Sequence, residues 1–309
     1  MFPQQPQTTA KKKGPKFNAG QFLNFTHDSY FERTSRPFYA VVFLLPFIVF
    51  YEMGTLMINT DVLSRTQVRV VAFVWLQNSL EYLGFGNKLA WAMPPLVVVI
   101  ILLALQLVSR KRWSFAFADV LPMTVECVLL AVPLIVLSLF LNTPAPSPSQ
   151  YDAHFLPPSL PAFDCSLTTL QSPSQTTVPD ATGADGGTLL AHIVTGVGAG
   201  IYEELVFRLI LICLLMIVLQ DLLRLNRQVS IVLAVIISAA LFSAHHHVVL
   251  LNGSLTWAAP FNSYEFGFRT VAGVYFAAVF AVRGFGITAV THAFYDVIAT
   301  VINFTFFSQ

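Results

Sequence analysis

Residues 198–210 read Gly-Ala-Gly-Ile-Tyr-Glu-Glu-Leu-Val-Phe-Arg-Leu-Ile, which places Glu203, Glu204 and Arg208 inside an otherwise apolar run. The run continues on both sides, from about residue 189 to residue 223, and is long enough to cross a lipid bilayer. An ionised group at the centre of a membrane helix costs about 2.5–3.5 kcal/mol on insertion scales. A chain that keeps three such groups in one apolar run is therefore expected to use them.

The composition is that of an integral membrane protein. Of the 309 residues, 55% are hydrophobic and 11% are charged, whereas a soluble domain carries roughly 25% charged residues. The net charge of +1 provides no electrostatic attraction toward nucleic acid or other highly charged partners. The expected partners are instead the lipid bilayer and membrane-associated molecules.

Apolar runs of about 18 residues are candidate membrane spans, because the hydrocarbon layer is roughly 30 Å thick. The chain is predicted to be an all-α, polytopic transmembrane helical bundle of about seven spans plus an interfacial amphipathic helix. The amphipathic helix is expected within Thr60 to Lys88, at the interface or beside the bundle. The predicted spans cover residues 37–58, 91–108, 120–141, 189–223, 229–250, 266–282 and 287–307.

The fourth run is too long for one perpendicular span, because a continuous helix over it would measure about 50 Å. A break or a strong tilt is predicted near Gly196, Gly198 and Gly200, just before the two glutamates. Two glycines near the start of the last run, Gly284 and Gly286, would allow a further kink.

Composition divides the chain into four segments. Residues 1–36 are predicted to be a disordered basic tail, and residues 37–141 form the N-terminal membrane helices. Residues 142–187 are a Pro/Ser/Thr-rich extramembrane loop without Lys or Arg, and residues 188–309 hold every unusual polar motif. Basic clusters in the tail, at 110–112 and at 224–227 predict a multi-pass protein with a cytoplasmic N-terminus under the positive-inside rule.

The paired glutamates are expected to have different roles. Glu204 and Arg208 are four residues apart on one helix face, with the acid nearer the N-terminus, which is the better orientation for a helical ion pair. A structural ion pair is therefore the expected role of Glu204 and Arg208. Glu203 lies about 100° around the helix without an obvious partner, which makes it the candidate general base.

Two further polar motifs follow on later apolar runs. The first is Phe242-Ser-Ala-His-His246, and the second is His292-Ala-Phe-Tyr-Asp296, whose His and Asp face the same way. In a regular helix, one of the three consecutive histidines at 245–247 can point at a given packing site, and His246 shares the face of Phe242. His245 and His247 are interpreted as interface or loop histidines, and Glu265 with Arg269 as a structural pair.

Four polar or ionisable side chains lie on three separate apolar runs, where each is energetically unfavourable. One shared polar site explains them more easily than four independent roles. These groups are Glu203, His246, His292 and Asp296. A glutamate with histidines can activate water for attack on a carbonyl, and a His/Asp pair can stabilise an oxyanion or hold a metal. The usual zinc-protease signature, H-E-x-x-H, is absent.

At these residues the sequence resembles the CPBP family, also called the Abi or CAAX-protease family, whose best-known members are the type II CAAX prenyl endopeptidases. The family motifs are E-E-x-x-x-R, F-x-x-x-H and H-x-x-x-N/D on successive membrane helices. They match Glu203 to Arg208, Phe242 to His246 and His292 to Asp296 in that order. The resemblance covers about residues 189–302, and the order of all three motifs is what makes it specific.

The resemblance implies an intramembrane endopeptidase that hydrolyses a membrane-anchored peptide or protein, with a prenylated CAAX-type substrate as the family's known case. It implies that Glu203 and His246 activate water and that His292 and Asp296 form the oxyanion site. No cofactor is implied as obligatory, although Glu203, His246 and His292 could hold a divalent metal such as zinc. The prenyl proteases carry Asn at the last position, and Asp296 suits orienting His292 or binding a metal.

Two other classes of function use the same groups. A non-catalytic relative could employ the polar cavity as a membrane binding, immunity or scaffolding module, and a transporter could use buried Glu and His as a proton relay. Retention of every motif position favours catalysis over scaffolding. The two halves show no inverted repeat, which argues against a transporter.

Overall fold

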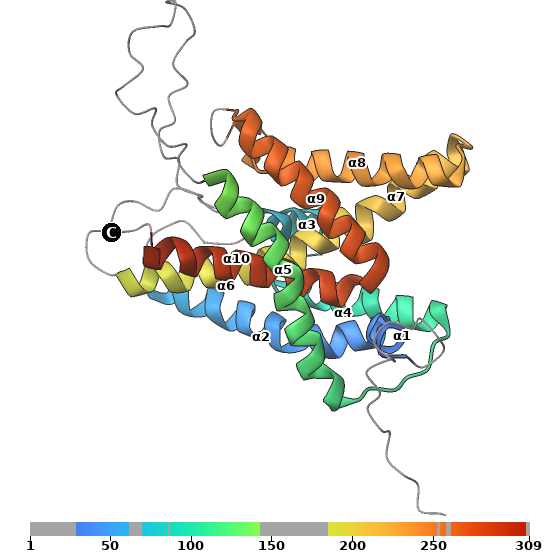
Figure 1. Ribbon diagram of the computed structural model, residues 1–309, viewed down its shortest axis with the longest axis horizontal. Helices are drawn as coiled ribbons and strands as arrows, with labels where there is room; N and C mark the ends of the chain where they lie inside the picture. Colours follow the sequence, from blue (N-terminus) through green and yellow to red (C-terminus); the bar gives the residue numbers. More distant parts are fainter. Residues whose placement is uncertain are drawn as a thin grey trace, which may run out of the picture.

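The computed structural model of this chain is a bundle of membrane helices with one small hairpin, and it describes residues 29–61, 70–85, 87–142, 185–251, 254–257 and 261–306. Figure 1 shows the helices crossing one another around α10. In chain order the elements are α1 (Tyr30–Thr34), α2 (Pro37–Asp61), α3 (Val71–Tyr82), α4 (Asn87–Ser109), η2 (Phe117–Asp119), α5 (Val120–Asn142), α6 (Asp185–Glu204), η3 (Leu205–Leu211), α7 (Ile212–Met216), η4 (Ile217–Leu222), α8 (Arg227–His245), β1 (Val248–Leu251), β2 (Ser254–Trp257), α9 (Ser263–Arg283) and α10 (Phe285–Phe306).

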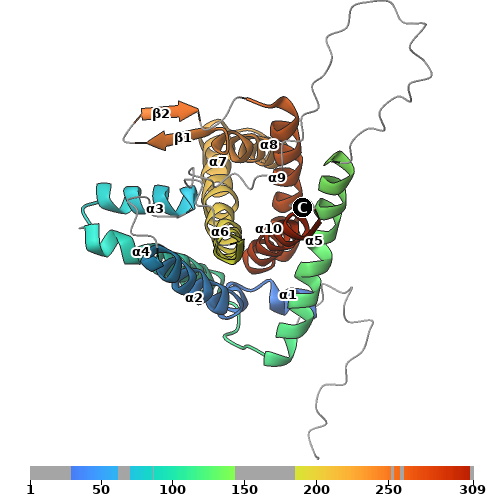
Figure 2. The same cartoon turned by 90° about the vertical axis from the view of Figure 1, so that its left-hand side faces the viewer.

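The predicted polytopic helical bundle is confirmed. Within the described residues, six helices are long and apolar enough to cross a membrane, and a shorter apolar helix, Met93–Ser109, lies at the second predicted span. The strands β1 and β2 form an antiparallel hairpin, shown beside α8 in Figure 2, that the sequence did not predict. The predicted loop at residues 142–187 lies almost entirely outside the described residues, since α5 ends at Asn142 and α6 begins at Asp185.

The last helix, α10, forms the centre of the bundle and packs against α2, α5, α6 and α9. Its N-terminal half, from Phe285 to Ala293, is buried throughout. Large apolar side chains such as Leu45, Leu129 and Leu214 are exposed on the outer helices, as expected of surfaces that face lipid rather than water. The centre of the bundle, which α10 shares with α6, is therefore where a protected site can form.

Glycines on α6 allow the close approach of α10. A Cβ at Gly200 would lie 2.5 Å from the backbone nitrogen of Ala293 and 2.6 Å from the carbonyl oxygen of Ala289. A Cβ at Gly198 would likewise lie 2.2 Å from the ring of Tyr51 on α2. Small residues at such spacing are the usual means by which membrane helices pack closely.

Of the break or strong tilt predicted at these glycines, the break is wrong, because α6 runs without interruption through Gly196, Gly198 and Gly200 to Glu204. The irregular backbone comes directly after the glutamates, where η3 is a π-helical segment. Figure 1 shows α7 continuing at an angle to α6. π-Helical turns of this kind are frequent at functional sites. Of the two glycines expected to allow a further kink, Gly284 has a φ of 75° and separates α9 from α10, whereas Gly286 lies inside α10.

The predicted disordered tail, residues 1–36, includes a segment that is helical in the structure. Residues 1–28 lie outside the described residues, but residues 30–34 form α1, which docks on the membrane helices. Tyr30 donates a hydrogen bond to Glu126 over 2.8 Å, and Arg283 bonds both Glu126 and Thr34. Polar contacts from two distant helices, α5 and α9, order this segment, and a composition argument does not detect them.

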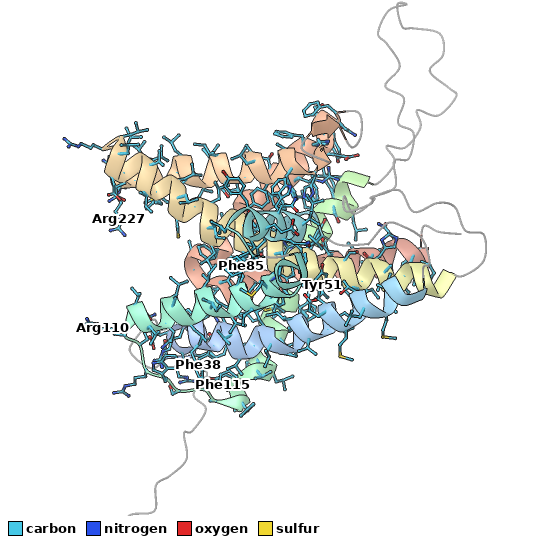
Figure 3. The ribbon with its side chains drawn as sticks, turned by 180° about the vertical axis from the view of Figure 1, so that it is seen from behind. Phe38, Tyr51, Phe85, Arg110, Phe115 and Arg227 are labelled. Atoms are coloured by element: carbon cyan, nitrogen blue, oxygen red, sulfur yellow. The ribbon has the colours of Figure 1, made fainter. Side chains whose placement is uncertain are left out.

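The predicted amphipathic helix between Thr60 and Lys88 corresponds to α3, although residues 62–69 and 86 lie outside the described residues. Its buried side chains include Ala72, Phe73 and Leu80, and it packs against α4 and α6. Figure 3 places Arg110 and Arg227, at the end of α4 and the start of α8, toward the same end of the molecule.

Candidate active site

The C-terminal end of α6 holds two buried glutamates that face different partners. Glu203 is 2% exposed and Glu204 is 0% exposed. Adjacent residues of a helix point about 100° apart, so the two side chains cannot share one set of contacts. Each glutamate lies in a cluster of its own, here called the Glu203 cluster (Glu203, His245 and His246) and the Glu204 cluster (Glu204, Arg208, His292 and Asp296).

Glu204 forms the predicted ion pair with Arg208, with 3.1 Å between Oε2 and Nε and both side chains fully buried. Its other oxygen lies 2.8 Å from Nδ1 of His292. Because Arg208 favours the ionised carboxylate, Nδ1 of His292 is the donor in this hydrogen bond. Arg208 also donates to the carbonyl of Gly273 and lies 4.2 Å from the ring centroid of Phe242. The charge of Glu204 is thus compensated within the bundle.

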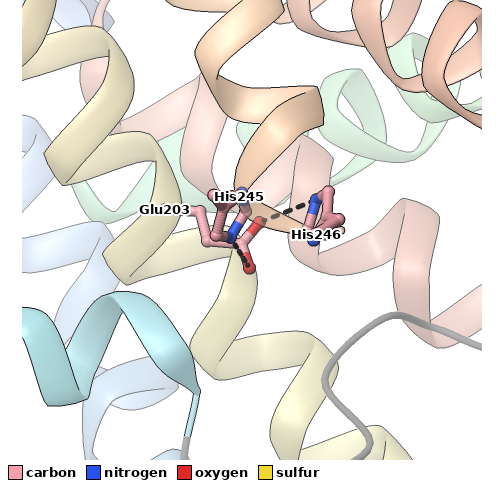
Figure 4. A group of neighbouring side chains, drawn as sticks. All are labelled: Glu203, His245 and His246. Atoms are coloured by element: carbon pink, nitrogen blue, oxygen red, sulfur yellow. Dashed lines mark ion pairs between the residues drawn. The ribbon is translucent and has the colours of Figure 1, made fainter. Parts of the chain in front are cut away.

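Glu203 faces two histidines instead of an arginine, as Figure 4 shows. Its Oε1 lies 3.5 Å from Nε2 of His245, and its Oε2 lies 3.9 Å from Nε2 of His246. Among the described residues, no Lys or Arg forms an ion pair with Glu203. The structure therefore brings together the two residues predicted to activate water, and adds a third.

His245 is the residue that the sequence argument assigned to an interface or loop. That argument assumed a regular helix through residue 247, whereas α8 ends at His245. The backbone N–H groups of His246 and His247 instead bond the carbonyls of Ser243 and Ala244, three residues earlier. This tighter turn places His245 and His246 side by side, with ring centroids 3.9 Å apart. The available signal was three consecutive histidines at the end of an apolar run.

The tautomer of His245 is fixed by its surroundings. Its Nδ1 lies 2.6 Å from the carbonyl oxygen of Phe242, and a carbonyl can only accept, so Nδ1 carries a hydrogen and donates. In the neutral ring Nε2 therefore presents a lone pair toward Glu203. The ring is also held by Phe207, at 4.9 Å between centroids, and by Trp75 at 5.6 Å.

His292 and Asp296 belong to the Glu204 cluster rather than to the Glu203 cluster. Nε2 of His292 lies 3.6 Å from Oδ2 of Asp296, and its ring stacks on Phe276 at 4.4 Å. The Phe242 ring contacts both clusters edge to face, 5.0 Å from the His246 ring and 5.9 Å from the His292 ring. The four predicted site residues are thus adjacent, but they divide into two clusters separated by one aromatic ring.

A divalent metal fits the Glu203 cluster by the chemistry of its donors. One carboxylate oxygen and two imidazole nitrogens lie within 4.8 Å of one another, and a glutamate with two histidines is a known donor set of catalytic zinc sites. Within the described part of the chain this is the group of three donors that meets the spacing. It contains Glu203 and His246 of the predicted ligand set, with His245 in the place of His292.

Two neighbouring groups have structural roles. Glu265 and Arg269 form the predicted ion pair, with 3.1 Å between Oε2 and Nη1. His247 is buried and packs against the rings of Phe261 and Phe266. Burial lowers the pKa of His247, and the nearby Arg269 guanidinium lowers it further. The neutral form of His247 is therefore favoured, as suits a packing residue beside the site.

Comparison with known proteins identifies the part of the chain that contains both clusters. Residues 185–298 match the family model described as type II CAAX prenyl endopeptidase Rce1-like. Searches of curated proteins and of solved structures gave no significant match. The matched range begins at the start of α6 and includes both clusters entirely.

Proposed function

We propose that this chain is an intramembrane endopeptidase whose water is activated by Glu203 and His246, in keeping with the match of residues 185–298 to the Rce1-like family model of type II CAAX prenyl endopeptidases. The observation that carries the proposal is the Glu203 cluster, in which a buried carboxylate without an ion-paired Lys or Arg faces two imidazoles. Such a carboxylate can accept a proton from water, whereas Glu204 already pairs with Arg208 and His292.

The proposed reaction needs one water and one peptide bond. Glu203 takes a proton from the water while the oxygen attacks the carbonyl carbon, and the carbonyl oxygen becomes an oxyanion. The tetrahedral centre then collapses, the C–N bond breaks, and the proton passes from Glu203 to the leaving nitrogen. His246 holds the water against Glu203 through its Nε2. The products are a carboxylic acid and an amine, which exchange a proton to become a carboxylate and an ammonium group, so atoms and charges balance.

We assign the oxyanion to the side of the Glu204 cluster. Nδ1 of His292 is occupied by Glu204, which leaves Nε2 as the atom that can face a substrate oxygen. In its protonated form this nitrogen donates a hydrogen bond to the developing charge. Asp296, 3.6 Å from Nε2, orients the ring, and the Glu204–Arg208 pair fixes it from the opposite side. Burial of these groups strengthens each electrostatic interaction.

The residues of the Glu203 cluster would hold a divalent metal if one is used. Such an ion supplies Lewis-acid polarisation of the water and of the substrate carbonyl. A chelator added to the wild type would abolish cleavage that depends on the ion and leave hydrolysis by Glu203 and His246 alone unchanged.

The proposed substrate is a membrane-anchored peptide, with a prenylated CAAX-type C-terminus as the finer possibility suggested by the family. The site lies among helices long and apolar enough to span the bilayer, so a substrate reaches it most easily from the lipid or its interface. We propose further that the N-terminus is cytoplasmic, in keeping with the basic residues near the ends of α4 and α8.

The test is cleavage of a membrane-anchored peptide library, with and without a prenylated cysteine, by the full chain in liposomes. Mass spectrometry should detect shortened peptides with the wild type and a rate about 10²–10⁴-fold lower with His246→Ala. Preferential cleavage of the peptides that carry a prenylated cysteine would support a prenylated CAAX-type C-terminus as the substrate. Absence of any cleavage by the folded wild type would leave a binding or scaffolding role as the better reading and overturn the proposal.

A further inference from the structure

Arg269 lies on the face of α9 that is turned toward the candidate site. Positions three, four and seven residues apart share one face of a helix, so Arg269 faces the same way as Phe266 and Phe276. The Phe276 ring stacks on His292 at 4.4 Å between centroids, and the Phe266 ring packs against His247 at 6.1 Å. Arg269 therefore lies between a contact with the proposed oxyanion site and a contact at the edge of the site.

The guanidinium of Arg269 is only partly used by its ion pair. Nη1 donates to Oε2 of Glu265 over 3.1 Å, and this is the one hydrogen bond of the Arg269 side chain within the described part of the chain. A guanidinium carries five N–H donors in a planar fork. The Arg269 side chain is 15% exposed and that of Glu265 33% exposed, so an incoming polar group can reach the pair. Nε and Nη2 are thus available to a second acceptor.

A second nitrogen near Arg269 also lacks a partner. Nε2 of His247 is buried and forms no hydrogen bond with the residues that the structure describes. The charge of Arg269 acts on the His247 ring, which places the two groups near each other. An unsatisfied buried polar atom costs about 1–3 kcal/mol, and a neutral imidazole with its hydrogen on Nε2 can donate to an acceptor. A ligand that supplies an anionic acceptor would satisfy both groups.

The anion that every unmodified peptide carries at its end is the C-terminal carboxylate. Arginine binds carboxylates through two parallel, charge-assisted hydrogen bonds. Along α9, Arg269 lies about two turns, or about 10 Å, from Phe276 and hence from the His292 ring on which Phe276 stacks. About three extended residues span that distance. A peptide whose scissile carbonyl faces Nε2 of His292 therefore brings its C-terminus to Arg269 if it ends about three residues beyond that bond.

We infer that Arg269, with His247 as a second donor, binds the C-terminal carboxylate of the peptide substrate. The site therefore selects peptide bonds near a free C-terminus over internal ones. The pair with Glu265 holds the guanidinium in position before the substrate arrives, so the structural role of that pair is retained. The inference rests on the proposed function, because it names the part of the substrate that the same site recognises.

The test uses one peptide with a prenylated cysteine in two forms, with a C-terminal carboxylate or with a C-terminal carboxamide. Binding to the labelled full chain is measured by microscale thermophoresis in a neutral detergent, where no anionic lipid competes. The Glu203→Gln background keeps both peptides intact, and kcat/KM is measured separately with Glu203 present. The carboxylate form should bind at least about tenfold more tightly, as expected of a hydrogen bond to a charged group, and should have a correspondingly higher kcat/KM.

Three substitutions separate binding from structure. Arg269→Gln removes the guanidinium, so the ratio of the two affinities should fall to about one, whereas Arg269→Lys keeps the charge and should retain part of the preference. His247→Phe keeps a ring against Phe266 but removes the nitrogen, and it should lower the ratio by a smaller factor. Glu265→Gln is the matched control, because it breaks the same ion pair but leaves the guanidinium, and it should keep the preference for the carboxylate.

Equal affinity of the Glu203→Gln protein for the two peptides would overturn the inference, as would a preference that survives in folded Arg269→Gln. Loss of the preference in Glu265→Gln to the same extent as in Arg269→Gln would also overturn it, because the ion pair alone would then explain the effect. Selective binding of the carboxylate form together with a wild type that cleaves neither peptide would support the Arg269 site and overturn the proposed hydrolysis. Cleavage of both forms with equal kcat/KM would overturn the Arg269 site and leave the hydrolysis intact.

Discussion

Glu203 and Glu204 are adjacent in the sequence, chemically identical and equally buried, yet the bundle surrounds them with different partners. Glu204 has Arg208 at 3.1 Å and His292 at 2.8 Å, so its charge is neutralised inside the protein. Glu203 has two imidazoles at 3.5 and 3.9 Å and no ion-paired Lys or Arg in the described structure. The partners, rather than the residue type or the depth of burial, separate a structural carboxylate from one available for chemistry.

The largest effect on stability is expected when the Glu204 cluster loses its cation. Arg208→Met keeps an apolar side chain in place but leaves a buried carboxylate uncompensated, which costs about 3–5 kcal/mol. The thermal unfolding midpoint in detergent should fall sharply. The double variant Glu204→Gln/Arg208→Met should recover much of the loss, because the uncompensated charge is gone. A single variant as stable as the wild type would show that Arg208 is not what compensates Glu204.

The next largest effect tests the helix contact that brings His292 to Glu204. A Cβ at Gly200 would overlap the backbone of Ala293 and Ala289 on α10, so Gly200→Ala should cost about 1–3 kcal/mol through overpacking. Gly267 on α9 is the matched control, since a Cβ there would meet nothing within 4 Å. Gly267→Ala should stabilise the helix by up to about 1 kcal/mol. Equal thermal midpoints for the two variants would contradict the close α6–α10 contact.

A smaller effect is expected at Asp296, where this chain departs from the Asn of the prenyl proteases. The amide of Asp296→Asn can still contact Nε2 of His292, so the change replaces one polar contact by another worth about 0.5–1.5 kcal/mol. The cleavage rate in liposomes should change less than about tenfold. Complete loss of cleavage in a folded Asp296→Asn protein would assign a direct catalytic role to the carboxylate.

The smallest effect is expected for an ion pair with the same i,i+4 spacing as Glu204 and Arg208 but with solvent contact. Glu265 is 33% exposed and Arg269 15% exposed, and exposed helical pairs contribute about 0.3–0.5 kcal/mol. Glu265→Gln should therefore shift the thermal midpoint only slightly, and the shift should shrink in high salt. A loss of thermal stability as large as that of Arg208→Met would show that the i,i+4 spacing, and not burial, decides how much such an ion pair contributes to stability.

The membrane fold and the Glu204–Arg208 pair could be predicted because both depend on short-range pattern. Apolar run lengths located the spans, and a four-residue spacing located the ion pair. The break predicted near residue 200 is wrong because a glycine in a helix can permit either a bend or a close contact with another helix. The buried backbone of α10 decides between these, and it lies about 90 residues away in the chain.

The division of the site into two clusters could not be predicted for a similar reason. Spacing identified Glu203, His246, His292 and Asp296, but which glutamate His292 contacts depends on the rotation of α10 against α6. His245 was missed because the end of α8, rather than helical periodicity, sets its direction. Three consecutive histidines at the end of an apolar run should therefore be considered together when a buried carboxylate lies nearby.

The most direct test of the central claim is the cleavage rate of Glu203→Gln in liposomes, measured beside its thermal midpoint. Glutamine retains the size of the side chain but cannot accept the proton of the water. We expect the midpoint to stay near that of the wild type, because no ion-paired Lys or Arg loses its partner, while the rate falls about 10²–10⁴-fold. A folded Glu203→Gln protein that cleaves the same peptides at the wild-type rate would contradict the account.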